Sequence, residues 1–473
     1  MPKLTPDLEL LMRMNSNRIM NTIFENRYLL RGTFKGKGFE VKNCDCDVTI
    51  NPLDTSTMIA KIYAQPENTG LDYLNLPITD WKEVEFSDNI PGHPSHLRGR
   101  IRLQSHTNSF GVIAEIETKD FTKYTVYTDN DFTADKLTMD FTLSQCNLFQ
   151  LGYMSKVDRK KGYQRGVDPW TGKFEDESIT VTFTWGTMSF SRGLYLSRKD
   201  KLDATSVLAE PAVVSVTHKC EPKDINLIWT EAENLIKEIL PLLSFVDGQK
   251  VEWTSVDTYA ELNEKKIMVV EQYQSIPKLN YRYHSEPDVN RYRTLRYQFC
   301  LLMEKYLTLE ATLRVSMKKA IDPYLLGSNQ EFPIKVAIML FQSAIEVFVK
   351  QFASSVESKI AEWGYPKGKT PTASMRIVGL LEAYHIDINK YYPELEIQSI
   401  KKDRAQLPFV EFRNNIMHEG DFPLNGTEEE AQIHAKNMDE IFRVLLYSIL
   451  VEHGSQMPGF KILSNNEPDS MNQ

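Results

Sequence analysis

Cysteine is scarce in this sequence, with five residues among 473. So few thiols in so long a chain exclude the disulfide scaffold that is typical of small secreted domains. The closest pair, Cys44 and Cys46, has no second pair at the spacing of a zinc site, and Cys146, Cys220 and Cys300 stand alone. We therefore predict no metal site and interpret these residues as ordinary strand and core cysteines.

Long apolar runs are also missing. No window approaches the roughly 18 uninterrupted apolar residues of a membrane helix. The first nine residues lack the apolar core of a signal peptide. With 41% hydrophobic and 25% charged residues, the composition is ordinary for a soluble globular protein. We expect a cytoplasmic protein that does not bind membranes.

An excess of positive charge is absent too, since the net charge is −9. This balance argues against a polycation that coats nucleic acid, although a local basic patch would suffice for an RNA substrate. The glycine-rich phosphate loops, the H-E-x-x-H zinc motif and the G-x-S-x-G nucleophile elbow do not occur. We therefore predict no cofactor.

The order of local patterns predicts an α+β protein. Short runs of alternating β-branched and polar residues, clearest at 178–185, indicate a β-rich antiparallel domain over residues 1–220, of the sandwich or barrel type. A helix near 222–245 and two strands near 251–260 and 267–272 form a predicted linking region, 221–285. The polar residues 454–473 are expected to be a disordered tail.

Residues 286–453 have helical periodicity. We predict long helices over 288–320 and 333–363, and shorter ones at 374–384, 407–418 and 427–451. The helix at 407–418 carries Arg413 and His418, five positions apart. Arginine offers a fixed charge and a planar fork of donors that suits a phosphate, and histidine moves protons near neutral pH. Such a pair can cleave RNA without a metal, through a ribose 2′-hydroxyl.

The spacing alone is weak, because an R-x4-H pair arises by chance in roughly one such sequence in two. A comparable pair, Arg100 and His106, lies where arginines at 98, 100 and 102 alternate with apolar residues. We interpret that segment as a strand with a solvated face. Arg413 differs because Asn414 follows it, the setting is helical, and Glu419 and Gly420 end the helix.

With these features, the segment Phe412–Gly420 resembles the signature of the HEPN family (higher eukaryotes and prokaryotes nucleotide-binding), R-x4–6-H with a polar residue after the arginine. Residues 240–253 resemble a helix-to-strand junction, and residues 341–348 an early helix, of the ApeA-like group of bacterial anti-phage HEPN ribonucleases. That group pairs a β-rich N-terminal domain with a C-terminal α-helical HEPN bundle. The resemblance implies an endoribonuclease of abortive infection, with tRNA among the family's known targets.

The resemblance also implies roles for residues. His418 would be the general acid or base and Arg413 the phosphate stabiliser, while Asn414 would orient the histidine or contact ribose. Five residues turn a helix by about 140° beyond a full turn, so Arg413 and His418 share a face poorly. Either a second protomer completes the site, or the helix bends or ends before His418, since Gly420 suits a C-cap. We expect a homodimer.

Other residues could support RNA binding. Lys401, Lys402 and Arg404 lie just upstream of the motif, and a basic run at 156–165 contains a tyrosine, although either could be a solvated loop. Glu346 borders an apolar helical stripe and could pair with Arg413 or stay exposed.

Two rival functions fit the same pattern. One is a non-catalytic HEPN-fold scaffold or RNA-binding module, in which Arg413 pairs with an acid and His418 interacts with the helix dipole. The other is a toxin controlled by a partner nucleotidyltransferase. In that group the motif often continues as H-x-Y, whereas Glu419 and Gly420 follow the histidine here. The β-rich domain could restrain a nuclease or sense a phage-derived trigger.

Overall fold

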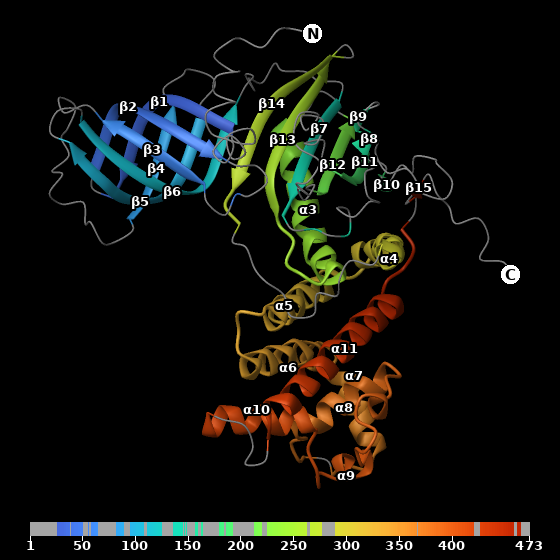
Figure 1. Ribbon diagram of the computed structural model, residues 1–473. Helices are drawn as coiled ribbons and strands as arrows, with labels where there is room; N and C mark the ends of the chain where they lie inside the picture. The colour runs from blue at the N-terminus through green and yellow to red at the C-terminus, as the bar shows by residue number, and fades with distance from the viewer. Residues whose placement is uncertain are drawn as a thin grey trace.

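The computed structural model describes most of residues 26–464. Residues 1–25 and 465–473 lie outside the described part, and so do the internal stretches 65–81, 89–94, 125–135, 149–156, 164–178, 193–211, 277–288, 421–425 and several shorter ones. Figure 1 shows a β-barrel, a second sheet that carries a helix, and a helical region beyond them. The predicted α+β class is confirmed, with an antiparallel β-rich first half and a helical second half.

The first six strands close into an antiparallel barrel. Strand β6 pairs with β3, then β2, β1, β4 and β5 follow, and β5 returns to β6. Alternate side chains, such as Leu30, Phe34 and Val48, fill the interior, as a period of two requires. The strands are β1 (Asn26–Gly36), β2 (Phe39–Ile50), β3 (Ile59–Ala64), β4 (Lys82–Asp88), β5 (Ser95–Thr107) and β6 (Gly111–Tyr124).

A second antiparallel sheet continues from the barrel, because the end of β6 also pairs with β14. Its order is β14, β13, β7, β12, β11, β10 and β15. A separate small hairpin joins β8 (Val157–Asp158) to β9 (Gly162–Tyr163). The strands of the second sheet are β7 (Lys136–Leu143), β10 (Ile179–Phe183), β11 (Gly186–Arg192), β12 (Ala212–Lys219), β13 (Trp253–Leu262), β14 (Lys265–Gln274) and β15 (Lys461–Ser464).

Two segments lie at positions in the fold that the sequence did not predict. The region 221–285 supplies helix α3 (Ile225–Asp247), which packs on the second sheet, and strands β13 and β14, which connect that sheet to the barrel. Within the tail that we expected to be disordered, β15 pairs with β10. Strand pairing between distant segments leaves no local pattern, so neither placement could be inferred from composition.

The helical region begins after β14, and two of the predicted long helices are broken in it. The stretch 288–320 splits into α4 and α5 at residues 308–310, and the stretch 333–363 bends by 85° between α6 and α7 at Phe352. The elements are α4 (Val289–Leu307), α5 (Ala311–Ser328), α6 (Ile334–Gln351), α7 (Ala353–Glu362), α8 (Ala373–Ala383), η6 (Ile388–Lys390), α9 (Ile397–Lys401), α10 (Pro408–Glu419) and α11 (Glu428–His453).

Within the described residues, no single helix is both long and apolar enough to cross a bilayer. The bent pair α6 and α7 meets the criteria of length and composition only when its two halves are taken together. The apolar residues of α6 are largely core residues of the helical region, including Phe341, Ile345 and Phe348.

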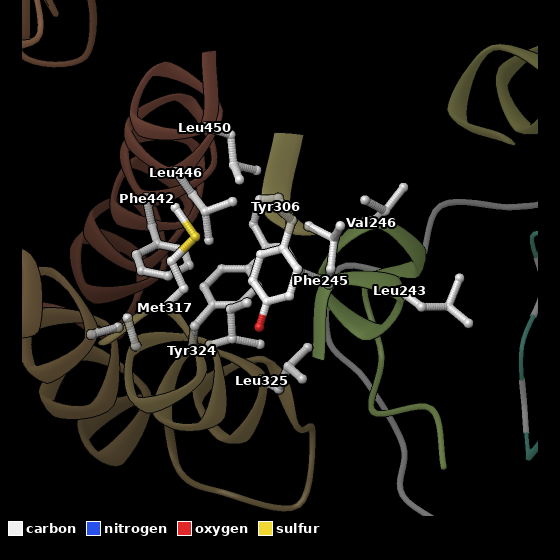
Figure 2. Close-up of a cluster of buried hydrophobic side chains, with 14 of the residues drawn as sticks. Leu243, Phe245, Val246, Tyr306, Met317, Tyr324, Leu325, Phe442, Leu446 and Leu450 are labelled. Atoms are coloured by element: carbon white, nitrogen blue, oxygen red, sulfur yellow. The ribbon is translucent and has the colours of Figure 1, made fainter. Parts of the chain in front are cut away.

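Two hydrophobic clusters divide the molecule. One fills the barrel and includes Tyr273 of β14. The other runs from the inner face of the second sheet through α3 into the helices, where Phe245, Tyr324 and Phe442 meet (Figure 2). The helical region therefore shares its core with the second sheet, whereas the barrel has a core of its own.

A buried polar contact braces the helices inside the larger cluster. Tyr324 donates its hydroxyl hydrogen to Asp439 at 2.5 Å, and Arg443 lies 3.4 Å from the same carboxylate. The Arg443 guanidinium also stacks over the rings of Phe245 and Tyr324, 5.6 and 5.5 Å from their centroids. Burial raises the pKa of Tyr324, so its phenol remains a donor. These contacts fix α11, one of the two helices, with α6, on which α10 packs.

Candidate functional site at the end of helix α10

Helix α10 is fixed at both ends. Pro408 occupies its first turn, and the backbone N–H of Leu407 before it donates to Ser374 Oγ at 3.0 Å. Gly420 ends the helix in the left-handed region, with φ 74°, and its N–H donates to the Ile416 carbonyl at 3.0 Å. The predicted C-cap is confirmed, and the helix continues past His418 rather than ending before it.

The packed face of α10 fixes the direction of Arg413. Phe409, Phe412 and Ile416 are buried against the neighbouring helices, and the Phe412 ring meets the His434 ring edge-on at 4.5 Å. Arg413 lies on the same side of the helix and is half-buried, whereas His418 is exposed in the last turn. A separation of about 140° on a regular helix explains this difference. One copy of α10 therefore presents the two residues in different directions.

Side-chain amides hold the guanidinium of Arg413. Arg413 Nη1 donates to Asn414 Oδ1 at 3.2 Å, and Asn414 Nδ2 donates to Gln406 Oε1 at 3.2 Å. No ion pair joins Arg413 to any carboxylate within the described residues. Asn415, the next amide, donates instead to the backbone carbonyl of Glu411 at 3.0 Å. Asn414 thus contacts the arginine, whereas the side chain of Asn415 bonds only to the backbone of its own helix.

Glu346 does not pair with Arg413. It is half-buried on α6 and accepts a hydrogen bond from Gln342 Nε2 at 2.8 Å, one turn earlier in the same helix. The open question from the sequence, whether this carboxylate neutralises the arginine, is therefore answered in favour of a local contact.

The basic residues upstream of α10 divide into two kinds. Lys401 lies 2.6 Å from Glu382 of α8 and stacks at 5.0 Å over the ring of Trp363, the residue after α7, so its charge is used in contacts within the fold. Lys402 and Arg404 are exposed in the turn after α9, and no described carboxylate forms an ion pair with either. Of the basic run at 156–165, only short backbone segments are described, so its side chains lie outside the described part.

Two residues near the site were not found from the sequence. Lys335, in the first turn of α6, donates through Nζ to the Gly420 carbonyl at 3.4 Å and so brings another cation to the end of α10. Gln406 contacts Asn414 from just before the helix. Lys335 is 85 positions from Gly420, and no local spacing signals that proximity. A polar residue eight positions before Asn414 is equally unremarkable in sequence.

The competing arginines on β5 have ordinary partners. Arg98 pairs with Glu85 at 3.0 Å and Arg100 with Glu83 at 3.4 Å, on the solvated face that the alternation predicted. The side chain of His106 lies outside the described part. These pairs belong to the outer surface of the barrel.

The buried cysteines of the barrel form no recognisable metal site. Cys44 and Cys46 are fully buried on β2, and burial raises the pKa of the Cys44 thiol to about 11. Across the described residues, no group of three or more histidine, cysteine or carboxylate side chains could hold a metal ion.

Comparison with known proteins adds no assignment. No family model matches the chain, and a search of curated proteins finds no match either. The geometry at the end of α10 is thus the main structural guide to function.

Proposed function

We propose that this protein is a HEPN-type, metal-independent endoribonuclease whose site is built on Arg413, Asn414 and His418. One observation carries the proposal. Arg413 is half-buried, held by an amide rather than by a described carboxylate, and lies on a helix whose last turn exposes His418. With no ion-pair partner among the described residues, Arg413 keeps its remaining donors available to a phosphate.

The proposed reaction removes a proton from the ribose 2′-oxygen and adds one to the leaving 5′-oxygen. Neutral His418 takes the proton from the ribose 2′-hydroxyl while water gives one to the leaving 5′-oxygen. If His418 is protonated, it gives the proton to the 5′-oxygen and water takes the one from the 2′-hydroxyl. The 2′-oxygen bonds to phosphorus as the bond from phosphorus to the 5′-oxygen breaks. Arg413 stabilises the charge on the phosphate oxygens. The products are a cyclic phosphate and a 5′-hydroxyl.

The separation of Arg413 from His418 on α10 favours a site shared between two protomers. A C2 dimer could set the His418 of one helix against the Arg413 of the other, because identical helices meet most simply about a two-fold axis. Light scattering would test the oligomeric state, and a strict monomer at micromolar concentration would contradict the shared site. Mixing the inactive Arg413→Ala and His418→Ala proteins should restore part of the cleavage, because one composite site in each heterodimer is then intact.

A cleavage assay tests the function itself. Purified protein and RNA are incubated with EDTA, and the ends of the products are analysed. We expect cleavage to persist and the products to carry cyclic phosphate and 5′-hydroxyl ends. Activity that is lost in EDTA and restored by magnesium would show a different mechanism. Binding without cleavage under all conditions would favour the scaffold alternative.

The biological setting belongs to the same proposal. As in the ApeA-like group, the enzyme would act in the cytoplasm during abortive infection, on tRNA or another RNA. The barrel, with a core separate from that of the helices, is a candidate sensor for a phage-derived trigger.

A further inference from the structure

A chain of two hydrogen bonds runs from Gln406 through Asn414 to Arg413. Both donor–acceptor distances are 3.2 Å. Gln406 stands beside Leu407, which is fully buried and whose N–H is fixed by Ser374 Oγ at 3.0 Å. Gln406 itself is exposed, but the backbone on its C-terminal side is fixed to α8 through this bond to Ser374.

The hydrogen-bonding capacity of arginine fixes which atoms donate and which accept along these two hydrogen bonds. A guanidinium can only donate hydrogen bonds, so the oxygen of the Asn414 amide must face it. The Asn414 amide nitrogen then points the other way and needs an acceptor. Gln406 Oε1 is that acceptor. Without it, the Asn414 amide could rotate and release the arginine.

We propose that Gln406 is a positioning residue, which holds Arg413 in its phosphate-binding orientation by fixing the amide of Asn414. This inference rests on the proposed nuclease function, because it assigns Arg413 the phosphate. Gln406 does not touch the substrate in this scheme. Its effect is on the rate of the chemical step, since a pre-set cation need not reorganise as charge develops.

The experiment is a double-mutant cycle. Gln406→Met keeps the bulk of the side chain and removes the acceptor, and it should lower kcat by about two- to tenfold. We expect little change in KM and none in the thermal midpoint, which separates positioning from folding. Adding Gln406→Met to Asn414→Ala should cost no further rate, within about twofold, because the two residues act in one chain.

Two variants provide controls. Asn415→Ala removes a neighbouring amide of the same type that bonds only to its own helix, and it should cleave like the wild type. Gln406→Glu keeps an acceptor oxygen at the same reach, so it should recover most of the kcat that Gln406→Met loses, while its negative charge near Arg413 should raise KM. Wild-type kcat in Gln406→Met, or losses that multiply in the double variant, would overturn the proposal.

A second measurement is independent of activity. Crystal structures of the wild type and of Gln406→Met should show the bond between Arg413 and Asn414 in the first and its loss in the second. An unchanged Arg413 in the variant would refute the positioning role even in an active enzyme. If the wild type cleaves no RNA at all, the nuclease proposal fails, and the structural comparison alone still decides whether Gln406 holds Arg413.

Discussion

The barrel and the end of α10 differ in how their basic side chains are paired. On the barrel, Arg98, Arg100 and Lys119 each lie within ion-pair distance of a glutamate. On α10, Arg413 contacts an amide and has no ion-pair partner among the described residues. The two arginine–histidine pairs look similar in sequence, yet only one contains an arginine left available to an external anion.

This difference distinguishes arginines that are already paired from one that can still bind an anion. Exposed ion pairs such as those on the barrel contribute about 0–1 kcal/mol each and are screened by salt, so they add little to stability. Arg413 is half-buried and has no ion-pair partner among the described residues, so it has lost part of its hydration without a matching electrostatic gain. Such an arrangement is expected where a substrate supplies the anion.

The largest effect should come from His418→Ala. Loss of a general acid or base lowers rates by about 10²–10⁴-fold. The variant should stay folded and bind RNA, since a histidine in the last turn of a helix contributes about 1 kcal/mol or less to stability. Arg98→Ala on the barrel is the matched control and should leave cleavage unchanged. Wild-type cleavage by His418→Ala would make the motif an accident of composition.

Arg413→Ala should have the next largest effect on cleavage, and it should also weaken RNA binding. Cleavage falls, and RNA affinity falls as well, because a charged hydrogen bond contributes about 1.5–3 kcal/mol. Filter binding and cleavage would be measured together. Arg100→Ala, which removes an arginine already paired with Glu83, should change neither. Equal losses in the two variants would remove the distinction between paired and unpaired arginines.

A smaller effect is expected in the turn before α10. The double variant Lys402→Ala, Arg404→Ala should weaken RNA binding and lower its salt dependence, by about one unit of slope for each lost phosphate contact. Lys401→Ala should instead lower the thermal midpoint, because Lys401 is engaged with Glu382 and Trp363. Binding titrations at several salt concentrations would distinguish them. A binding defect confined to Lys401→Ala would reverse this assignment.

The smallest effect concerns pH and the packing behind α10. Burial lowers the pKa of His434, which packs against Phe412. The unfolded state then binds a proton at His434 more readily than the folded state does. The free energy of unfolding is therefore fully retained above the unfolded-state pKa of 6.5 and decreases as the pH falls below that value. Thermal unfolding between neutral and mildly acidic pH would show this. His434→Phe should flatten the dependence, and an unchanged profile would contradict it.

Much of α10 could be predicted because its signals are local. The predicted span 407–418 differs from the observed Pro408–Glu419 by one residue at each end, since proline and glycine mark the two ends in sequence. The capping box of Thr427 and Glu430 likewise marks the start of α11.

What could not be predicted depends on contacts between distant segments. The bend at Phe352 lies inside an unbroken apolar period, and nothing in the local pattern announces it. The closure of the barrel by β5 on β6, and the approach of Lys335 to Gly420, are tertiary events. The availability of Arg413 is of the same kind, because only the fold shows that Glu346 turns to Gln342 instead.

The pairing of β15 with β10 has a consequence for biosynthesis. Because β15 follows α11 in the chain, the ribosome makes every helix of the larger core before the strand that covers the edge of β10. Until then that edge has open backbone donors and acceptors and could pair with another nascent chain. Completion of the sheet is thus a late event, and translation that stops after α11 would release a chain with its helices made and one sheet edge unprotected.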